Sequence, residues 1–263
     1  MKVFVGLFLA ICVIALGIFL VTPSTQGQKK YIDEPTVVHK GQVTEKERAY
    51  SKEYKELYPD REGRKLSGVV QLSKSKGNTR EVGVTIGIPQ TVTVGDMPFP
   101  TKAEFLSDLS CGADAVVLGS VRSKSAHMTD DETFIFTEYE LLVKDVLKNN
   151  SASRIDIDAS IQITRPGGLI SLDGQVIRAE DLSYELLQAD KEYLLFLRFV
   201  PGANGYVVSS PDGDFLLEQR TTRTLSKTAL PDGLAGIDST SLLSEVRKSL
   251  SVGCGKNTIR GSD

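Results

Sequence analysis

The chain has 263 residues, of which 25% are charged and 40% are hydrophobic, and its formal net charge is −3. This balance gives the surface no overall field that would attract nucleic acid or an anionic membrane. The sequence contains no HExxH pair, no Cys/His cluster with zinc-ligand spacing and no G-x-S-x-G motif, so the local signatures of these catalytic and metal sites are missing.

Residues 1–27 have the features of a leader. Nineteen uncharged residues, from 3 to 21, follow Lys2, and this length is within the range of about 17 to 25 that can span a bilayer. Pro23 ends the apolar run, and Thr25 and Gly27 stand at alternate positions, as in a signal peptidase site. A cleaved signal peptide and a retained signal anchor both remain open, with cleavage favoured. Either reading predicts that the rest of the chain lies outside the cytoplasm.

The cysteines predict one disulfide. After the leader, in which Cys12 is interpreted as apolar filler, only Cys111 and Cys254 remain. An even pair in an oxidising compartment favours a bond between them, and their spacing excludes a CxxC redox motif. Two unrelated buried thiols are the alternative.

The region from 28 to 100 is predicted to hold a tether, a helix and a hairpin. The tether is extended, and the helix over residues 44–57 opens with a capping box, in which the side chains of Thr44 and Glu47 accept hydrogen bonds from each other's backbone N–H groups. Pro59 prevents the helix from continuing much further.

One face of this helix is aromatic. Tyr50, Tyr54 and Tyr58 share it, which predicts docking on the body of the protein, with partner binding as the alternative. Residues 66–94 then alternate with period two and predict a hairpin or small sheet. Ten basic and six acidic residues lie between 44 and 80; we interpret them as a solvated surface rather than a polyanion site.

The region from 101 to 263 is predicted to be mainly β. A short helix opens with a second capping box at Thr101 and Glu104 and ends at Gly112, and a last helix covers residues 239–250. The strands expected between them cover residues 115–121, 134–147, 155–163, 193–197, 206–208 and 215–217.

Two strand patterns indicate how the sheet is shaped. The inward set of the strand over 134–147 changes phase at Lys144 and Asp145, which predicts a β-bulge and a bend. The strand over 193–197 is apolar on both sides and is expected to be covered on both faces. Five main strands, one long and bulged, favour a small closed OB-like antiparallel barrel over an open sheet, preceded by the helix-plus-hairpin region.

Several sequence segments resemble those of a known family. They are Ala-Asp-Ala-Val-Val-Leu-Gly at 113–119, YELLVKDVLK at 139–148, Gly-Gly at 167–168 and LQADKEYLLFL at 187–197. They resemble the OB-type barrel of the tissue-inhibitor-of-metalloproteinase and netrin-like superfamily, over about residues 105–255. The resemblance implies a fold. Its metalloproteinase inhibitors act through an N-terminal Cys-x-Cys, which this sequence lacks, so it does not imply that activity.

The remaining polar residues give no assembled site. His39 in the tether and His127 in a predicted polar loop are both expected to be exposed to solvent. Asp130, Asp131 and Glu132 are adjacent rather than spaced as calcium ligands, so they predict a charged hairpin loop. We therefore expect no catalytic residue, cofactor or metal site from local motifs.

Two classes of function follow. The first is an exported, non-enzymatic binding or interaction module that contacts a protein, glycan or envelope component through loops at one end of the barrel. The alternative is an envelope or secreted hydrolase or lyase whose carboxylates come together only in three dimensions. Nucleic acid is not expected as a partner, because no aromatic platform is interleaved with basic residues.

Overall fold

The computed structural model describes residues 34–39, 41, 43–58, 65–66, 84–88, 101–181, 185–210, 212–218, 221–225 and 230–254. The predicted leader lies outside these residues. Within them, no helix has the length and apolar character needed to cross a bilayer.

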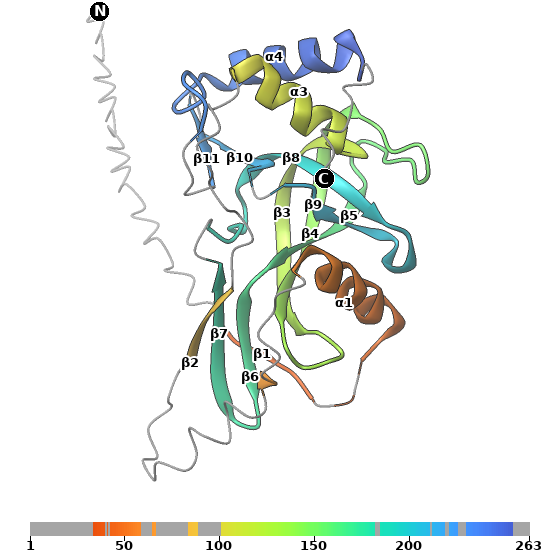
Figure 1. Ribbon diagram of the computed structural model, residues 1–263, viewed down its shortest axis with the longest axis vertical. Helices are drawn as coiled ribbons and strands as arrows, with labels where there is room; N and C mark the ends of the chain where they lie inside the picture. Colours follow the sequence, from red (N-terminus) through yellow and green to blue (C-terminus); the bar gives the residue numbers. More distant parts are fainter. Residues whose placement is uncertain are drawn as a thin grey trace, which may run out of the picture. The chain divides into compact units, whose positions relative to one another are not determined.

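The described part of the chain is mainly β (Figure 1). Its helices are α1 (Glu45–Leu57), α3 (Lys102–Gly112), the 3-10 turn η1 (Pro201–Ala203) and α4 (Ser239–Val252). Its strands are β1 (Thr36–Val37), β2 (Val84–Ile88), β3 (Ala115–Met128), β4 (Ile135–Lys148), β5 (Ser160–Pro166), β6 (Gly168–Leu172), β7 (Gln175–Asp181), β8 (Glu192–Val200), β9 (Gly205–Val208), β10 (Asp214–Leu217) and β11 (Thr222–Thr224).

The strands form two sheets. The larger has seven strands in the order β11-β10-β8-β3-β4-β5-β9, and β9 also pairs with β8. The smaller has four strands in the order β1-β6-β7-β2. In it, β1 and β2 pair in parallel with β6 and β7, so segments before residue 101 hydrogen-bond to segments after it. Of the hairpin predicted over 66–94, only β2 and Leu66 are described, and the partner strand of β2 is β7.

The predicted bulge is confirmed. Leu118 of β3 lies opposite Asp145, whereas the next residue, Gly119, lies opposite Val143, so Lys144 is the extra residue on β4. A Cβ on Gly119 would lie 2.7 Å from the carbonyl oxygen of Leu142, too close for any other residue type without a shift. Glycine therefore permits close approach of the two strands at the bulge.

The strand predicted over 155–163 is wrong in its first half, since β5 begins only at Ser160. Ile155 is buried but Ile157 is 58% exposed, and Asp158 has a φ of 65°. This left-handed residue interrupts the extended conformation, although the apolar alternation continues through it. A turn therefore occupies the segment from 156 to 159.

The hairpin β6–β7 was not predicted. Gly167 and Gly168 follow β5 directly, with φ of 89° and 150°, and at this point the chain passes from the larger sheet to the smaller one. Glycine tolerates these values, which other residues rarely adopt. The Gly-Gly pair thus ends β5, as expected, but it also starts a new strand.

Buried side chains lie on both faces of β8, as predicted. Tyr193, Leu195 and Leu197 belong to the inner core of the larger sheet, with Val117, Tyr139 and Leu141 of the neighbouring strands. Leu194 and Phe196 face the opposite way. They pack under α3 and α4 with Leu106, Leu109, Leu242 and Val246. Figure 1 shows these two helices side by side at one end of the sheet.

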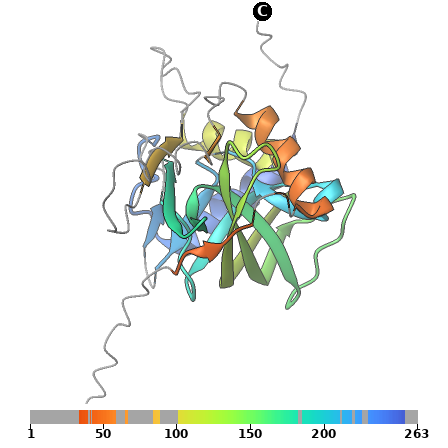
Figure 2. The ribbon, with the colours of Figure 1, turned by 90° about the horizontal axis from the view of Figure 1, so that it is seen from below.

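The aromatic face of α1 packs on the protein itself, as predicted. Tyr50 and Tyr54 are 0% and 1% exposed, and the ring of Tyr54 lies 5.2 Å from that of Phe134 and 5.3 Å from that of Phe136. The Tyr54 hydroxyl donates a hydrogen bond to Thr164 Oγ1 of β5 at 2.9 Å. Figure 2 shows α1 beside β8, to which Glu53 of α1 is joined by an ion pair with Arg198.

Candidate functional site

The candidate site lies where α1 meets β3. The capping box at the start of α1 is present, since the backbone N–H and the hydroxyl of Thr44 both donate to Glu47 Oε2, at 2.7 and 2.8 Å. These bonds hold one carboxylate oxygen at the helix terminus. The other oxygen, Oε1, lies 2.8 Å from Nδ1 of His127.

His127 stands on β3, so its predicted place in a polar loop is wrong. The strand extends to Met128 because β4 pairs with it along its full length. The side chain is 25% exposed, and its ring stacks on Phe136 with centroids 5.4 Å apart. His39, in contrast, is exposed as expected.

Ser125 completes a chain of three side chains. Its Oγ lies 2.8 Å from Nε2 of His127, on the side of the ring away from Glu47. Residues i and i+2 of a strand point to the same face, which explains why Ser125 and His127 meet. The chain therefore runs from a serine hydroxyl through an imidazole to a carboxylate.

The charge of Glu47 sets the direction of these hydrogen bonds. Burial raises the pKa of this carboxyl, but hydrogen bonds from the Thr44 backbone and from His127 outweigh it, and the pKa is lowered. An ionised carboxylate only accepts, so Nδ1 of His127 donates to it. In neutral imidazole, Nε2 is then the acceptor, and the Ser125 hydroxyl donates to it.

A charged residue of β4, paired with α1, lies opposite Ser125. Glu138 lies opposite Ser125 in the β3–β4 register, and Lys46 Nζ lies 2.6 Å from a carboxylate oxygen of Glu138. The neighbouring Ser123 donates instead to Glu140, at 3.1 Å. Ser123 and Ser125 are thus serines on one strand with different partners.

A hollow of about 320 Å³ lies farther along α1. Arg48, Lys52 and Lys55 line it from the helix, and Asp130 and Asp131 line it from the loop that joins β3 to β4. The prediction of a charged hairpin loop over 130–132 is therefore confirmed. The loop is fastened to α1, because the backbone N–H of Asp130 donates to the Ser51 hydroxyl at 3.0 Å.

A buried ion pair lies away from this region. Arg165 of β5 and Asp214 of β10 are 1% and 0% exposed and form a salt bridge. Each stands two residues from a member of the inner core, Ile163 and Leu216, so the pair faces the interior of the larger sheet. Sequence reasoning missed it, although the alternation through Ile161 and Ile163 already placed Arg165 on the inward side.

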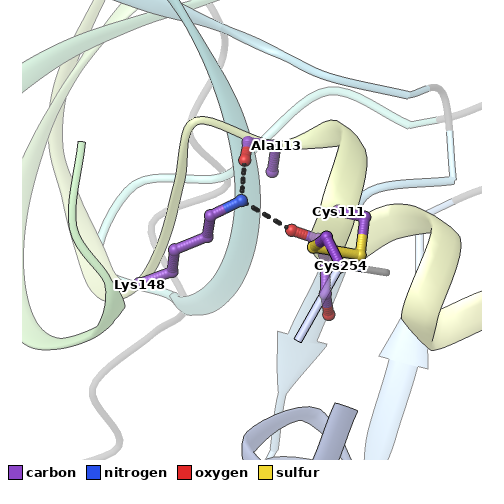
Figure 3. The surroundings of a disulfide bond; sticks show 5 residues. Cys111, Ala113, Lys148 and Cys254 are labelled. Atoms are coloured by element: carbon purple, nitrogen blue, oxygen red, sulfur yellow. Dashed lines mark hydrogen bonds between the residues drawn. A yellow bond between two sulfur atoms is a disulfide. The ribbon is translucent and has the colours of Figure 1, made fainter. Parts of the chain in front are cut away.

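The structure joins Cys111 to Cys254, the predicted pairing, with Cα atoms 5.4 Å apart (Figure 3). The bond ties the end of α3 to the segment after α4. Figure 3 shows the Lys148 side chain beside it, and its Nζ donates to the carbonyl oxygens of Ser110 and Ala113. The Lys148 ammonium group thus supplies hydrogen-bond donors, and a favourable positive charge, to carbonyl groups at the C-terminus of α3.

The members of the Ser125–His127–Glu47 chain could not be identified from local sequence. Glu47 and His127 are separated by 80 positions, so no motif links them. The only local signal was the i, i+2 spacing of Ser125 and His127, which predicts a shared face if the segment is a strand. Comparison with known proteins assigns no family, because no family model and no curated protein matches the sequence.

Proposed function

We propose that the chain is an exported binding module whose larger sheet closes into a small OB-like barrel. The order of the strand pairings supports closure. β8, β3, β4, β5 and β9 are successive neighbours, and β9 pairs again with β8. Of these pairings only β5–β9 is parallel. A ring of five strands is the number expected for an OB barrel.

The proposed relation to the tissue-inhibitor-of-metalloproteinase and netrin-like superfamily concerns the fold alone. The quoted phrases at 113–119, 139–148 and 187–197 fall on or beside β3, β4 and β8, three strands of the proposed ring. The inhibitory Cys-x-Cys is absent from the sequence, so protease inhibition is not part of the proposal.

The proposed binding surface is at the end of the barrel where α1 packs. OB barrels commonly bind their ligands, oligosaccharides among them, through the loops after their first and fourth strands. In the ring above, these are the loop between β3 and β4 and the turn η1 between β8 and β9. α1 contacts both of them. The outward side of α1 therefore replaces part of the surface that such loops usually present.

The charge on that side of α1 is the observation that carries the proposal. Arg48, Lys52 and Lys55 are exposed and recur at i, i+4 and i+7, so they share one face of the helix. No ion pair with any described residue neutralises them, although the half-buried cations Lys46 and Arg198 are paired. The sequence alone favoured a solvated surface over a polyanion site for the basic residues of 44–80. The shared helix face of these three cations, beside Asp130 and Asp131, leads us to propose instead that they contact the acidic groups of an anionic glycan.

Binding to an acidic polysaccharide, with polygalacturonate as the probe, tests this function by calorimetry. The double variant Lys52→Gln/Lys55→Gln is expected to bind about fivefold more weakly, since each exposed charge contact contributes about 0.5 kcal/mol. The control Lys191→Gln/Lys248→Gln removes the same charge from exposed positions elsewhere. Equal losses in both variants, or no binding by the unaltered protein, would contradict the proposal.

We also propose that the module acts outside the cytoplasm, released after cleavage near Gln28 or held by an uncleaved leader. The Cys111–Cys254 bond supports this location, because disulfides persist mainly in oxidising compartments. Intact-mass measurement on fractionated cells tests the proposal. A mature N-terminus near residue 28 would support cleavage, and a full-length protein in the cytosol would contradict export.

A further inference from the structure

We propose that Ser125, His127 and Glu47 form an acyl-transfer site in which Ser125 is the nucleophile. This activity goes beyond the binding function and does not depend on it. The supporting geometry is the order of the three groups. The hydroxyl lies 2.8 Å from one ring nitrogen of His127, and the carboxylate lies 2.8 Å from the other. Nucleophile, base and orienting carboxylate stand in this order in serine hydrolases of unrelated folds.

Other residues of the protein hold these three groups in place. Thr44 fixes the Glu47 carboxylate through its second oxygen, and Phe136 stacks on the His127 ring. Ser125 and His127 belong to a strand that is paired with β4 at both positions, opposite Glu138 and Phe136. The Glu47 carboxylate and the His127 ring therefore each have a second support, and the backbone of Ser125 is held in the sheet, as the positioning of a nucleophile and its base requires.

The balanced reaction is ester hydrolysis in two steps. Ser125 Oγ bonds to the carbonyl carbon of the ester while its proton passes to Nε2 of His127. The bond to the leaving alcohol then breaks, and the alcohol takes that proton. Water next attacks the acyl group and gives a proton to Nε2, and the bond to Oγ breaks as the proton returns to Ser125. The Glu47 carboxylate stabilises the imidazolium that forms in each step.

The surroundings indicate a small substrate. Ser125 and His127 are partly exposed, and the hollow on α1 is lined by other residues. A compact ester, such as an O-acetyl group, can reach an open serine of this kind without a deep acyl pocket. Lys46 is paired with Glu138, which lies opposite Ser125 in the register, and we assign to it the electrostatic stabilisation of the oxyanion.

A fluorophosphonate probe tests the nucleophile on the full, disulfide-bonded protein. Oγ forms a bond to phosphorus as the P–F bond breaks, and peptide mapping locates the label. We expect the label on Ser125, its loss in Ser125→Ala, and labelling about 100-fold slower in His127→Gln, the contribution of a general base. Ser123→Ala is the matched control, because its hydroxyl bonds to Glu140 rather than to His127; its labelling rate should not change.

Hydrolysis of p-nitrophenyl acetate tests Glu47 as a positioning residue. Glu47→Gln should lower kcat and leave KM unchanged, because the amide can orient the ring in the wrong tautomer while substrate binding is untouched. Unfolding curves of every variant show whether it is folded. A folded protein that takes up no label at Ser125 would overturn the proposal. Labelling that survives in Ser125→Ala would do the same, and so would variants that change only stability.

Discussion

The buried Arg165–Asp214 pair gives the strongest test of the interior of the larger sheet. Asp214→Asn keeps the shape of the side chain and removes its charge, so the salt bridge to the guanidinium of Arg165, 1% exposed, is lost. Breaking a buried pair in this way costs about 3–5 kcal/mol. Domains are typically stable by only about 5–15 kcal/mol, so the variant should be close to unfolding. The double variant Arg165→Met/Asp214→Leu buries no charge and should recover most of the loss.

Equilibrium unfolding in urea, with the disulfide intact, measures these free energies, and an unchanged slope with denaturant shows that two-state unfolding holds. Asp156→Asn is the control. This variant breaks an exposed ion pair, in which the side chains of Arg154 and Asp156 are 83% and 71% exposed. It should lower the free energy of unfolding by at most about 1 kcal/mol. If Asp214→Asn cost no more than this control, the buried pair would have to be in contact with water, and the reasoning would be refuted.

Three further predictions concern other parts of the structure. Replacing Cys111 and Cys254 by Ser should lower the free energy of unfolding by up to about 5 kcal/mol, because the disulfide closes a loop of 143 positions. An unchanged melting temperature in calorimetry would contradict this prediction. Because the pKa of Glu47 is lowered in the folded protein, its carboxylate contributes fully to stability above pH 4.5, and this contribution is lost as the pH falls through the folded-state pKa. In Glu47→Gln the free energy of unfolding should therefore fall less steeply with decreasing pH. Parallel curves of stability against pH for the two proteins would contradict this. Gly205→Ala should cost about 1–3 kcal/mol, since its Cβ would overlap the Tyr50 hydroxyl, and a neutral result by thermal melting would show that α1 can shift.

The elements that were predictable from the sequence depend on neighbouring residues. Both capping boxes formed, because each needs only a threonine and a glutamate three positions apart. The bulge at Lys144 was visible as a change of phase within one strand. The pairing of Cys111 with Cys254, 143 positions apart, is the exception: it followed from counting, since no other cysteine remains after the predicted leader.

The elements that were missed depend on distant partners. Residues 122–128 are mostly polar and have no clean alternation, yet they continue β3 because β4 supplies hydrogen-bond partners and α1 covers the strand. The hairpin β6–β7 likewise pairs with β1 and β2, which precede it by more than eighty positions. Ser125, His127 and Glu47 likewise come together only through the packing of α1 on β3, across 80 positions of sequence. The residue pattern within a short segment of one sequence contains no information on such distant pairings.

The position of the disulfide has a consequence for the timing of maturation. At synthesis rates of about 5–20 residues per second, roughly 7–30 s separate the appearance of Cys111 from that of Cys254, 143 positions later. During this interval Cys111 can wait only as a thiol or as a mixed disulfide with an oxidant. No third cysteine follows residue 27, so the part of the chain after the predicted leader has no wrong intramolecular pairing to correct. Its oxidative maturation therefore needs an electron acceptor but no disulfide isomerase.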